Sequence, residues 1–239
     1  MTVCILCEKP SVAASVAAVL GVKERHDGYL SGNGYLVTWA FGHLVQLAMP
    51  EAYGYTGFRR ENLPILPQEF KYIPRQIREG KEYKPDPGVL KQLKVIREVF
   101  DRSDRIVVAT DAGREGEAIH RYIYITLAAA NPACASRISS LTDRAIREGL
   151  DNLRPGSDYD NLYRAAEARA IADWEIGLNA TQATQHRRRA GHLLPRTGAD
   201  AHLDDDLLPL SGEQGFHPAD LFPAEGHGGK GRHALRRHL

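Results

Sequence analysis

The sequence contains little cysteine, tryptophan or methionine, and it has no long hydrophobic run. Only 3 of its 239 residues are cysteine, 2 are tryptophan and 2 are methionine. Three cysteines are too few for a disulfide framework, and a membrane-spanning helix needs about 20 consecutive apolar residues. No amino-terminal signal peptide is recognisable. We therefore expect a cytoplasmic protein without a membrane partner.

An excess of charge of one sign is also missing. The 31 Lys and Arg residues are balanced by 30 Asp and Glu residues, which gives a net charge of +1. Binding of nucleic acid through overall charge is thereby excluded, and any DNA contact must come from local groups of cations. The hydrophobic content of 43% is sufficient for a folded core, and the length allows one large or two small domains.

The spacing of Cys4 and Cys7 is that of a zinc or redox motif. Both residues lie inside the apolar run VCILC at 3–7, however, and no second pair of ligands accompanies them. Free cysteines of this kind are usually buried, so we expect core residues and no metal site here.

Acidic residues follow two short apolar runs. Residues 106–109, IVVA, have the composition of a strand buried on both faces of a parallel sheet, and Asp111 lies just past its end. The run at 3–7 is of the same kind and is followed at once by Glu8. Because adjacent parallel strands end at the same edge of a sheet, we expect Glu8 and Asp111 to lie together there.

The segment TDAGREGE, residues 110–117, adds Glu115 and Glu117 beside Arg114. One interpretation is ordinary: Asp111 caps a helix and the two glutamates favour its positive end. Gly113 and Gly116 are expected to let the backbone turn tightly before that helix. The presence of Glu8 favours a second interpretation, a Mg²⁺ site, because Mg²⁺ needs only one or two carboxylates together with phosphate and water.

The order of the other elements predicts an α/β fold with a doubly wound parallel sheet. A helix at 11–20 should be capped by Pro10-Ser11, and Thr142-Asp143 should begin another. The remaining expected features are strands at 29–30 and 35–41 joined by a turn at 32–34, a long irregular connection marked by prolines between 64 and 87, and an amphipathic helix at 89–100.

Beyond Pro155-Gly156 the pattern changes to a single helix, residues 158–183, with no strand. Arg169 and Asp173 are four residues apart and share one face of this helix, while Trp174 points elsewhere. The pair is either an ordinary helix ion pair beside a core tryptophan or part of a binding surface.

Five blocks in this order resemble the TOPRIM domain of type IA DNA topoisomerases, and most closely the topoisomerase III branch. The blocks are CEKPSVAASVAAVLG at 7–21, GHLVQLAMPEAYG at 42–54, TDAGREGEAIHRYIY at 110–124, ISSLTDRAIREGL at 138–150 and RAIADWEIGLNATQA at 169–183. The resemblance implies a Rossmann-like TOPRIM sheet with flanking helices over residues 1–155. It also implies that residues 156–183 begin a helical domain lining a groove for single-stranded DNA.

The resemblance further implies a site for Mg²⁺, or Mn²⁺ in its place, built from Glu8, Asp111 and Glu115. Many members of the family carry a second aspartate where this chain has Gly113, so one ligand is missing. Glu8 would act as general acid or base near the scissile phosphate. Lys9 and Arg114 would neutralise phosphate charge.

The implied partner is single-stranded or negatively supercoiled DNA, bound by a monomer through Lys9, Arg114 and Arg169, with Arg169 oriented by Asp173. In the family the nucleophilic tyrosine lies in a later domain, and none of the ten tyrosines here has the expected arginine-flanked context. We therefore expect this chain to be inactive alone as a topoisomerase. Two alternatives remain open: a TOPRIM nuclease or primase-like enzyme, and a noncatalytic DNA-binding remnant.

Residues 184–239 have a different composition. From His186 onward there are seven of the ten histidines but no Val, Ile, Tyr, Trp, Cys, Met or Asn. Synonymous codons for Thr184 to Leu203, read one base later, give LSIAAGRGTYSLGRVQTPT, which resembles the sequence that follows NATQA in topoisomerase III. We interpret 184–239 as an aberrant tail produced by a frameshift near residue 184, and we expect the tail to be disordered.

Overall fold

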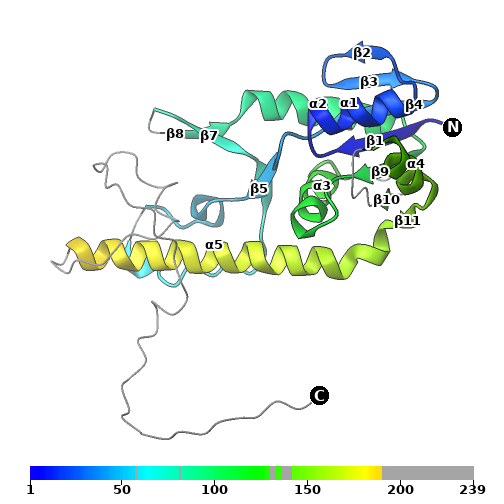
Figure 1. Ribbon diagram of the computed structural model, residues 1–239. Helices are drawn as coiled ribbons and strands as arrows, with labels where there is room; N and C mark the ends of the chain where they lie inside the picture. Colours follow the sequence, from blue (N-terminus) through cyan, green and yellow to red (C-terminus); the bar gives the residue numbers. More distant parts are fainter. Residues whose placement is uncertain (58, 81, 130–132, 136–141, 190–239) are drawn as a thin grey trace, which may run out of the picture. The chain divides into compact units, whose positions relative to one another are not determined.

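The computed structural model describes residues 1–57, 59–80, 82–129, 133–135 and 142–189 (Figure 1). Residues Met1–Asn179 form one compact unit, and a second unit begins at Ala180. The helices are α1 (Pro10–Val19), α2 (Pro87–Asp101), α3 (Arg114–Thr126), α4 (Asp143–Asp151) and α5 (Asp160–Arg189), with short 3₁₀ turns at Pro50–Tyr53, Arg60–Asn62 and Gly156–Tyr159. None of the helices in the described ranges is long and apolar enough to cross a membrane.

The main sheet has seven strands. Their order is β11 (Arg154–Pro155), β10 (Ala133–Ala135), β9 (Arg105–Ala109), β1 (Val3–Cys7), β4 (Tyr35–Trp39), β3 (Tyr29–Gly32) and β2 (Glu24–His26). Two further pairs are separate from it: β5 (Val45–Leu47) with β6 (Tyr72–Pro74), and β7 (Gln76–Glu79) with β8 (Glu82–Pro85).

The predicted parallel sheet with flanking helices is confirmed for the central strands, and both edges of the sheet are antiparallel. Strands β10, β9, β1 and β4 are parallel, but β3 and β2 continue from β4 as an antiparallel meander, and β11 is antiparallel to β10. The reason is local, because a two-residue turn can join only antiparallel neighbours. Asn33 and Gly34 make such a turn between β3 and β4 with φ of 50° and 80°, the positive values that a type I′ turn requires.

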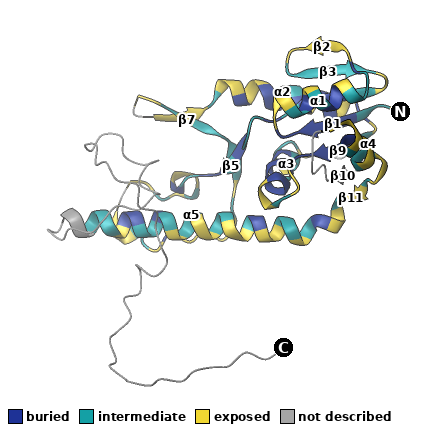
Figure 2. Ribbon diagram, viewed as in Figure 1, coloured by how far each residue is buried: buried dark blue, intermediate teal, exposed yellow. Residues whose placement is uncertain are grey.

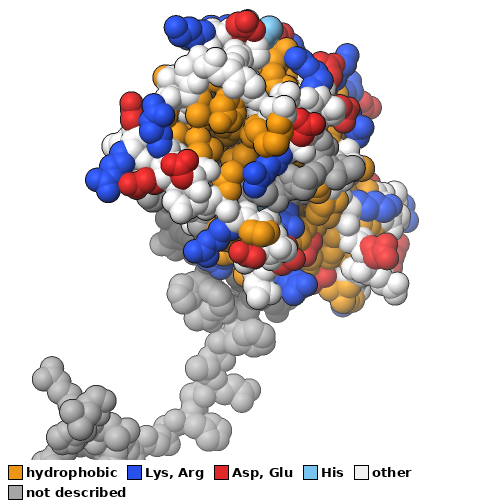
Figure 3. Space-filling model, turned by 90° about the vertical axis from the view of Figure 1, so that its right-hand side faces the viewer, with side chains coloured by type: hydrophobic (Ala, Val, Ile, Leu, Met, Phe, Trp, Pro, Cys, Tyr) orange, Lys and Arg blue, Asp and Glu red, His pale blue; other side chains and the backbone are white. Residues whose placement is uncertain are grey.

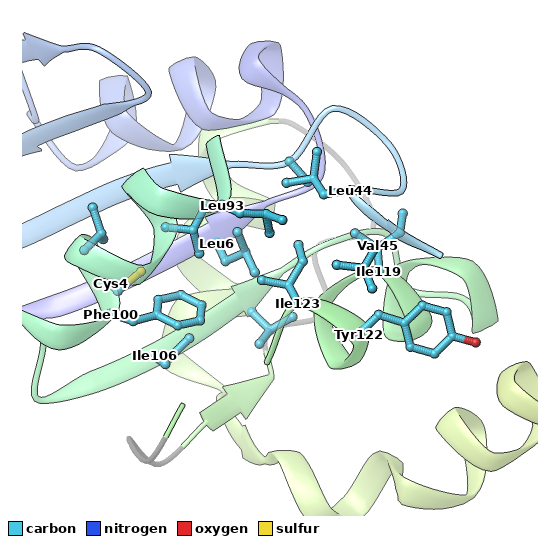
Figure 4. Packing of buried hydrophobic residues seen from close by; sticks show 14 of the residues in the cluster. Cys4, Leu6, Leu44, Val45, Leu93, Phe100, Ile106, Ile119, Tyr122 and Ile123 are labelled. Carbon is cyan, nitrogen blue, oxygen red and sulfur yellow. The ribbon is translucent and has the colours of Figure 1, made fainter. Parts of the chain in front are cut away.

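Alternating side chains of the central strands supply two separate layers of core. On one face, Ile5 and Cys7 of β1 pack with Val107 of β9 and with residues of α1 and α4. On the other face, Cys4 and Leu6 pack against α2 and α3 (Figure 4). Figure 2 shows the central strands β1 and β9 in the dark blue of buried residues. Cys4 and Cys7 are fully buried on opposite faces, as expected for core residues, and burial raises the pKa of the Cys7 thiol to about 12.

Among the described residues, side chains cap the starts of α2 and α4, whereas α1 and α3 begin without a side-chain cap, so Asp111 does not cap α3. Asp86 caps α2 by accepting hydrogen bonds from the amides of Gly88 and Val89, and the Thr142 hydroxyl accepts from the Ala145 amide at the start of α4. Ser11 is not the cap that we predicted for α1, because the helix begins at Pro10, the position where proline's fixed φ and missing N–H fit best.

The segment 64–87 is more regular than its prolines suggest. It contains β6, β7 and β8. The Arg75 amide donates a hydrogen bond to Leu44 O, and the Gln76 amide donates one to the Gln46 side chain. Tertiary pairing therefore outweighs local propensity in this segment.

Helix α5 is longer than predicted and is anchored within the first unit. Its Asn179 side chain pairs with both the amide and the carbonyl of Ile65, at 2.7 and 2.9 Å, and the Trp174 indole donates to Ala48 O at 3.0 Å. The helix continues to Arg189, past the predicted frameshift point, because glutamine and arginine are good helix formers. The tail that we predicted to be disordered, residues 184–239, is therefore helical over 184–189, and its remaining residues, 190–239, lie outside the described residues.

Candidate metal and phosphate site

The register of β1 against β9 determines where the two predicted acids meet. Cys7 is opposite Ala109, so Glu8 and the residues after Ala109 leave the same edge of the sheet. The Asp111 amide donates a hydrogen bond of 3.2 Å to Glu8 Oε2. Glu8 is buried at this edge, whereas Asp111 is exposed. The predicted juxtaposition of Glu8 and Asp111 is confirmed.

A close backbone approach holds Asp111 beside the start of α3. A β-carbon added at Gly116 would lie 2.1 Å from Asp111 O, which is far inside contact distance, so only glycine fits. Thr110 Oγ1 donates to Gly116 O at 2.8 Å and fixes the same turn. Gly113 is different from our expectation, because its φ of −140° is open to any residue and an added β-carbon there would meet nothing within 4 Å.

The two glutamates of the motif point to opposite sides of α3. Residues two apart on a helix are rotated by about 200°, so Glu115 and Glu117 cannot share a face. Glu115 is exposed near the sheet edge, whereas Glu117 is buried and binds Arg121 Nε at 3.0 Å. The interpretation of Asp111, Glu115 and Glu117 as one group of acids is therefore wrong for Glu117, which has a structural role.

Sequence reasoning gave no role to His43, which the structure brings to this site. His43 Nε2 lies 3.2 Å from Glu115 Oε2, and both side chains are accessible. Arg75 donates to the His43 carbonyl at 3.2 Å and fixes the backbone of this residue. The only sign in the sequence was the place of this histidine, directly after Gly42 and the expected strand at 35–41. Nothing in the sequence indicated that it would contact Glu115.

The predicted cations are at the same edge of the sheet. Lys9 Nζ lies 3.2 Å from Glu8 Oε1, with more than half of the lysine side chain exposed. Arg114 is the exposed first residue of α3, where the positive end of the helix dipole also favours an anion. Two cations and the first turn of a helix thus lie at the same edge of the sheet as the two carboxylates, an arrangement suited to a phosphate and a bridging cation.

A divalent cation fits this edge of the sheet in part. Glu8 and Asp111 offer hard carboxylate oxygens, and the second of them is open to solvent. Among the described residues, no three of His, Cys, Asp and Glu are close enough to enclose a metal ion. The donors therefore suit Mg²⁺ held by one or two carboxylates with water and substrate phosphate, the usual manner for this ion. The assignment of Glu115 as a third ligand stays a prediction.

The buried face of α3 connects this site to the start of α5. Arg121 donates to Glu117, and its Nη2 donates at 2.7 Å both to Gly156 O and to Asp160 Oδ1. His120 lies beside Glu117, but burial lowers the pKa of its imidazole to about 3, so it is neutral at pH 7 and the two residues form no ion pair.

The predicted DNA-contacting residues of α5 share an exposed face. Arg169 Nε lies 3.5 Å from Asp173 Oδ2, and both side chains are largely exposed. Trp174 packs edge-on against Tyr53 and Phe70 instead. Figure 3 shows Lys and Arg side chains interspersed with Asp and Glu on the face in view, in agreement with the balanced charge of the chain.

The fold and the site together define an α/β protein with an acidic edge at the ends of its central parallel strands. Comparison with known proteins agrees: the Toprim domain model matches residues 3–141, and the chain belongs to this family.

The curated relatives include DNA topoisomerase 3 proteins from several bacilli. That of Bacillus licheniformis is 46% identical over 181 residues, which is 75% of this chain and 24% of that protein. That of Shouchella clausii is 43% identical over 190 residues, which is 78% of this chain and 25% of that protein. Full-length topoisomerase I from Thermotoga maritima is 24% identical, with a TM-score of 0.49, and the match covers 74% of this chain and 25% of that one. The chain thus spans about a quarter of the length of the curated relatives.

Proposed function

We propose that this chain forms the metal-binding and phosphate-binding part of a type IA DNA topoisomerase. The observation that carries the proposal is the meeting of Glu8 and Asp111 at one edge of the parallel sheet, with the Asp111 amide bonded to Glu8 Oε2. The identity of 43–46% to proteins named DNA topoisomerase 3 supports the choice of enzyme class.

Each residue at the edge has a task that its chemistry allows. Glu8, anchored by the Asp111 amide, would accept or donate a proton at the scissile phosphodiester. Lys9 and Arg114 would neutralise charge on the phosphate, and Asp111 and Glu115 would hold Mg²⁺. When bound, Mg²⁺ supplies positive charge that positions the DNA backbone for rejoining.

The partner is expected to be single-stranded or negatively supercoiled DNA. Arg169 on α5 would bind a backbone phosphate while Asp173 limits the directions in which the guanidinium can point. With a net charge of +1, such binding is weak and falls as salt concentration rises.

Metal binding by the 239-residue chain is the first test. We expect weak binding of Mg²⁺ or Mn²⁺ in calorimetry and its loss in Asp111→Ala. Asp101→Ala, which removes an exposed aspartate at the end of α2, should bind as the unchanged protein does. Equal binding by all three proteins would refute the assignment of the site.

Plasmid assays separate the proposed function from its alternatives. We expect this chain alone to leave negatively supercoiled DNA unrelaxed, because the family's covalent step needs a tyrosine from a later domain. Metal-dependent cleavage without a covalent protein–DNA link would instead indicate a nuclease. Relaxation by this chain alone would show that one of its own tyrosines is the nucleophile.

A further inference from the structure

A group of tyrosines joins the site to α5. Tyr72 and Tyr163 both donate a hydrogen bond to Glu167 Oε1, the second at 2.7 Å, and their hydroxyl oxygens lie 3.3 Å apart. Burial and the neighbouring carboxylate raise the pKa of both tyrosines well above 10, so both hydroxyls stay protonated and remain donors. The Glu167 carboxylate is therefore held in place by two neutral donors from β6 and from its own helix.

Tyr122 of α3 completes this group. Its ring centroid lies 4.7 Å from that of Tyr72 and 6.3 Å from that of Tyr163. The side chain is 4% exposed, and its hydroxyl has no hydrogen-bond partner among the described residues. Figure 4 shows the ring extending away from the aliphatic core around Ile119 and Ile123, with the hydroxyl at its far end. Burial, Glu167 and Glu115, in that order, raise the Tyr122 pKa to about 12, so both carboxylates act on this side chain.

The Tyr122 ring also lies near His43 of the site. The ring of His43 is tilted against it with a centroid distance of 6.4 Å, and His43 in turn contacts Glu115. A continuous series of contacts, which we call the relay, thus runs from Glu167 on α5 through Tyr72, Tyr122 and His43 to Glu115 at the sheet edge. Each step is an aromatic contact or a hydrogen bond, and aromatic pairs of this geometry favour defined orientations.

We propose that Tyr72, Tyr122 and Glu167 are positioning residues that hold His43 against Glu115 and thereby keep this carboxylate directed for metal binding. This inference deepens the proposed function and rests on it for the role of Glu115. Glu167 is two residues from Arg169, so the same segment of α5 carries both the expected phosphate contact and the anchor of the relay. Partners that hydrogen-bond a metal-binding carboxylate contribute to metal affinity by fixing its orientation.

The test uses two measurements on the 239-residue chain. The first is the NMR signal of the His43 ring at constant pH, which senses the Tyr122 ring current. The second is the dissociation constant for Mn²⁺ from electron paramagnetic resonance of the free ion. We expect Glu167→Ala and Tyr122→Leu to shift the His43 signal and to weaken Mn²⁺ binding by about tenfold, the lower end for a lost outer partner of a metal ligand.

Two matched variants serve as controls. Glu175→Ala removes another partly buried carboxylate of α5, eight residues beyond Glu167, and Tyr122→Phe keeps the ring that contacts His43. Both should retain the His43 signal and the Mn²⁺ affinity. Tyr72→Phe keeps the ring but removes the hydroxyl that bonds Glu167 and lies 3.3 Å from the Tyr163 hydroxyl, and it replaces Tyr122→Leu if that variant does not fold.

The outcomes distinguish the relay from the proposed metal site. If folded Glu167→Ala and Tyr72→Phe leave the His43 signal where it is, the relay is disproved and the tyrosines serve only stability. If the unchanged protein binds no Mn²⁺, the proposed metal site fails, while the His43 signal still decides whether these residues position His43.

Discussion

Gly116 and Asp111 are in such close contact that a β-carbon on the glycine would lie 2.1 Å from the aspartate's carbonyl oxygen. This contact brings the first turn of α3 over the end of β9 and sets the position of Asp111 against Glu8. The geometry of the acidic edge therefore depends on a residue that has no side chain.

The first prediction concerns this contact. Gly116→Ala should destabilise the protein by about 3 kcal/mol, because backbone atoms cannot yield as a flexible side chain can. Gly113→Ala is the matched variant: its β-carbon would meet nothing, and its backbone conformation suits any residue, so the stability should change by less than about 1 kcal/mol. Urea unfolding of both variants measures the difference. Similar losses in the two variants would contradict the role given to Gly116.

The second prediction concerns the missing carboxylate. Because position 113 is open and next to the site, Gly113→Asp should fold and should tighten Mg²⁺ or Mn²⁺ binding by about tenfold, which corresponds to about 1.4 kcal/mol. Calorimetry gives the affinity. Gly113→Asn, which adds a similar volume without charge, is the control and should gain less. Unchanged affinity in Gly113→Asp would place the bound ion elsewhere.

The third prediction concerns α5. Arg169→Ala should weaken binding of a single-stranded oligonucleotide and reduce the slope of log K against log salt by about 0.7, the value for one phosphate contact on a single strand. Arg144→Ala removes an exposed arginine from a similar pair with Glu148 on α4 and should leave the slope unchanged. Fluorescence anisotropy at several salt concentrations gives both slopes. Equal slopes for Arg169→Ala and the unchanged protein would remove Arg169 from the DNA surface.

The fourth prediction concerns pH. The folded-state pKa of His120 is about 3, below the ordinary value of 6.5, because the ring is buried. Between these two values the unfolded chain binds a proton that the folded protein does not, so stability is fully present above pH 6.5 and declines as pH falls. The contribution of this residue to the slope approaches about 1.4 kcal/mol per pH unit.

Urea unfolding between pH 4.5 and pH 7.5 tests the contribution of His120. His120→Asn should reduce the dependence of stability on pH, whereas His26→Asn, at an exposed position on β2, should preserve it. If the two variants behave alike, His120 is protonated in the folded protein and its environment is more polar than the structure indicates.

Much of this protein was determined by local sequence. The runs at 3–7 and 106–109 could only be buried strands, and acids placed directly after parallel strands had to meet at one edge, as Glu8 and Asp111 do. The cysteines were recognised as core residues because they lie within such a strand. In each case the alternation of side chains along a strand and the burial of apolar side chains are sufficient for the prediction, since neither depends on distant parts of the chain.

Only the tertiary structure decided which acids of the segment 110–117 lie at the sheet edge, which are buried, and which residues contact them. Glu115 faces the edge with His43, 72 residues away, while Glu117 is buried with Arg121. Glu167 accepts a hydrogen bond from Tyr72, which is 95 residues away in the sequence. Such contacts depend on how helices pack on a sheet, and the residue types alone are compatible with many partners. For the same reason the strands between residues 64 and 87 could not be predicted, because hydrogen bonding between distant segments outweighed their local propensities.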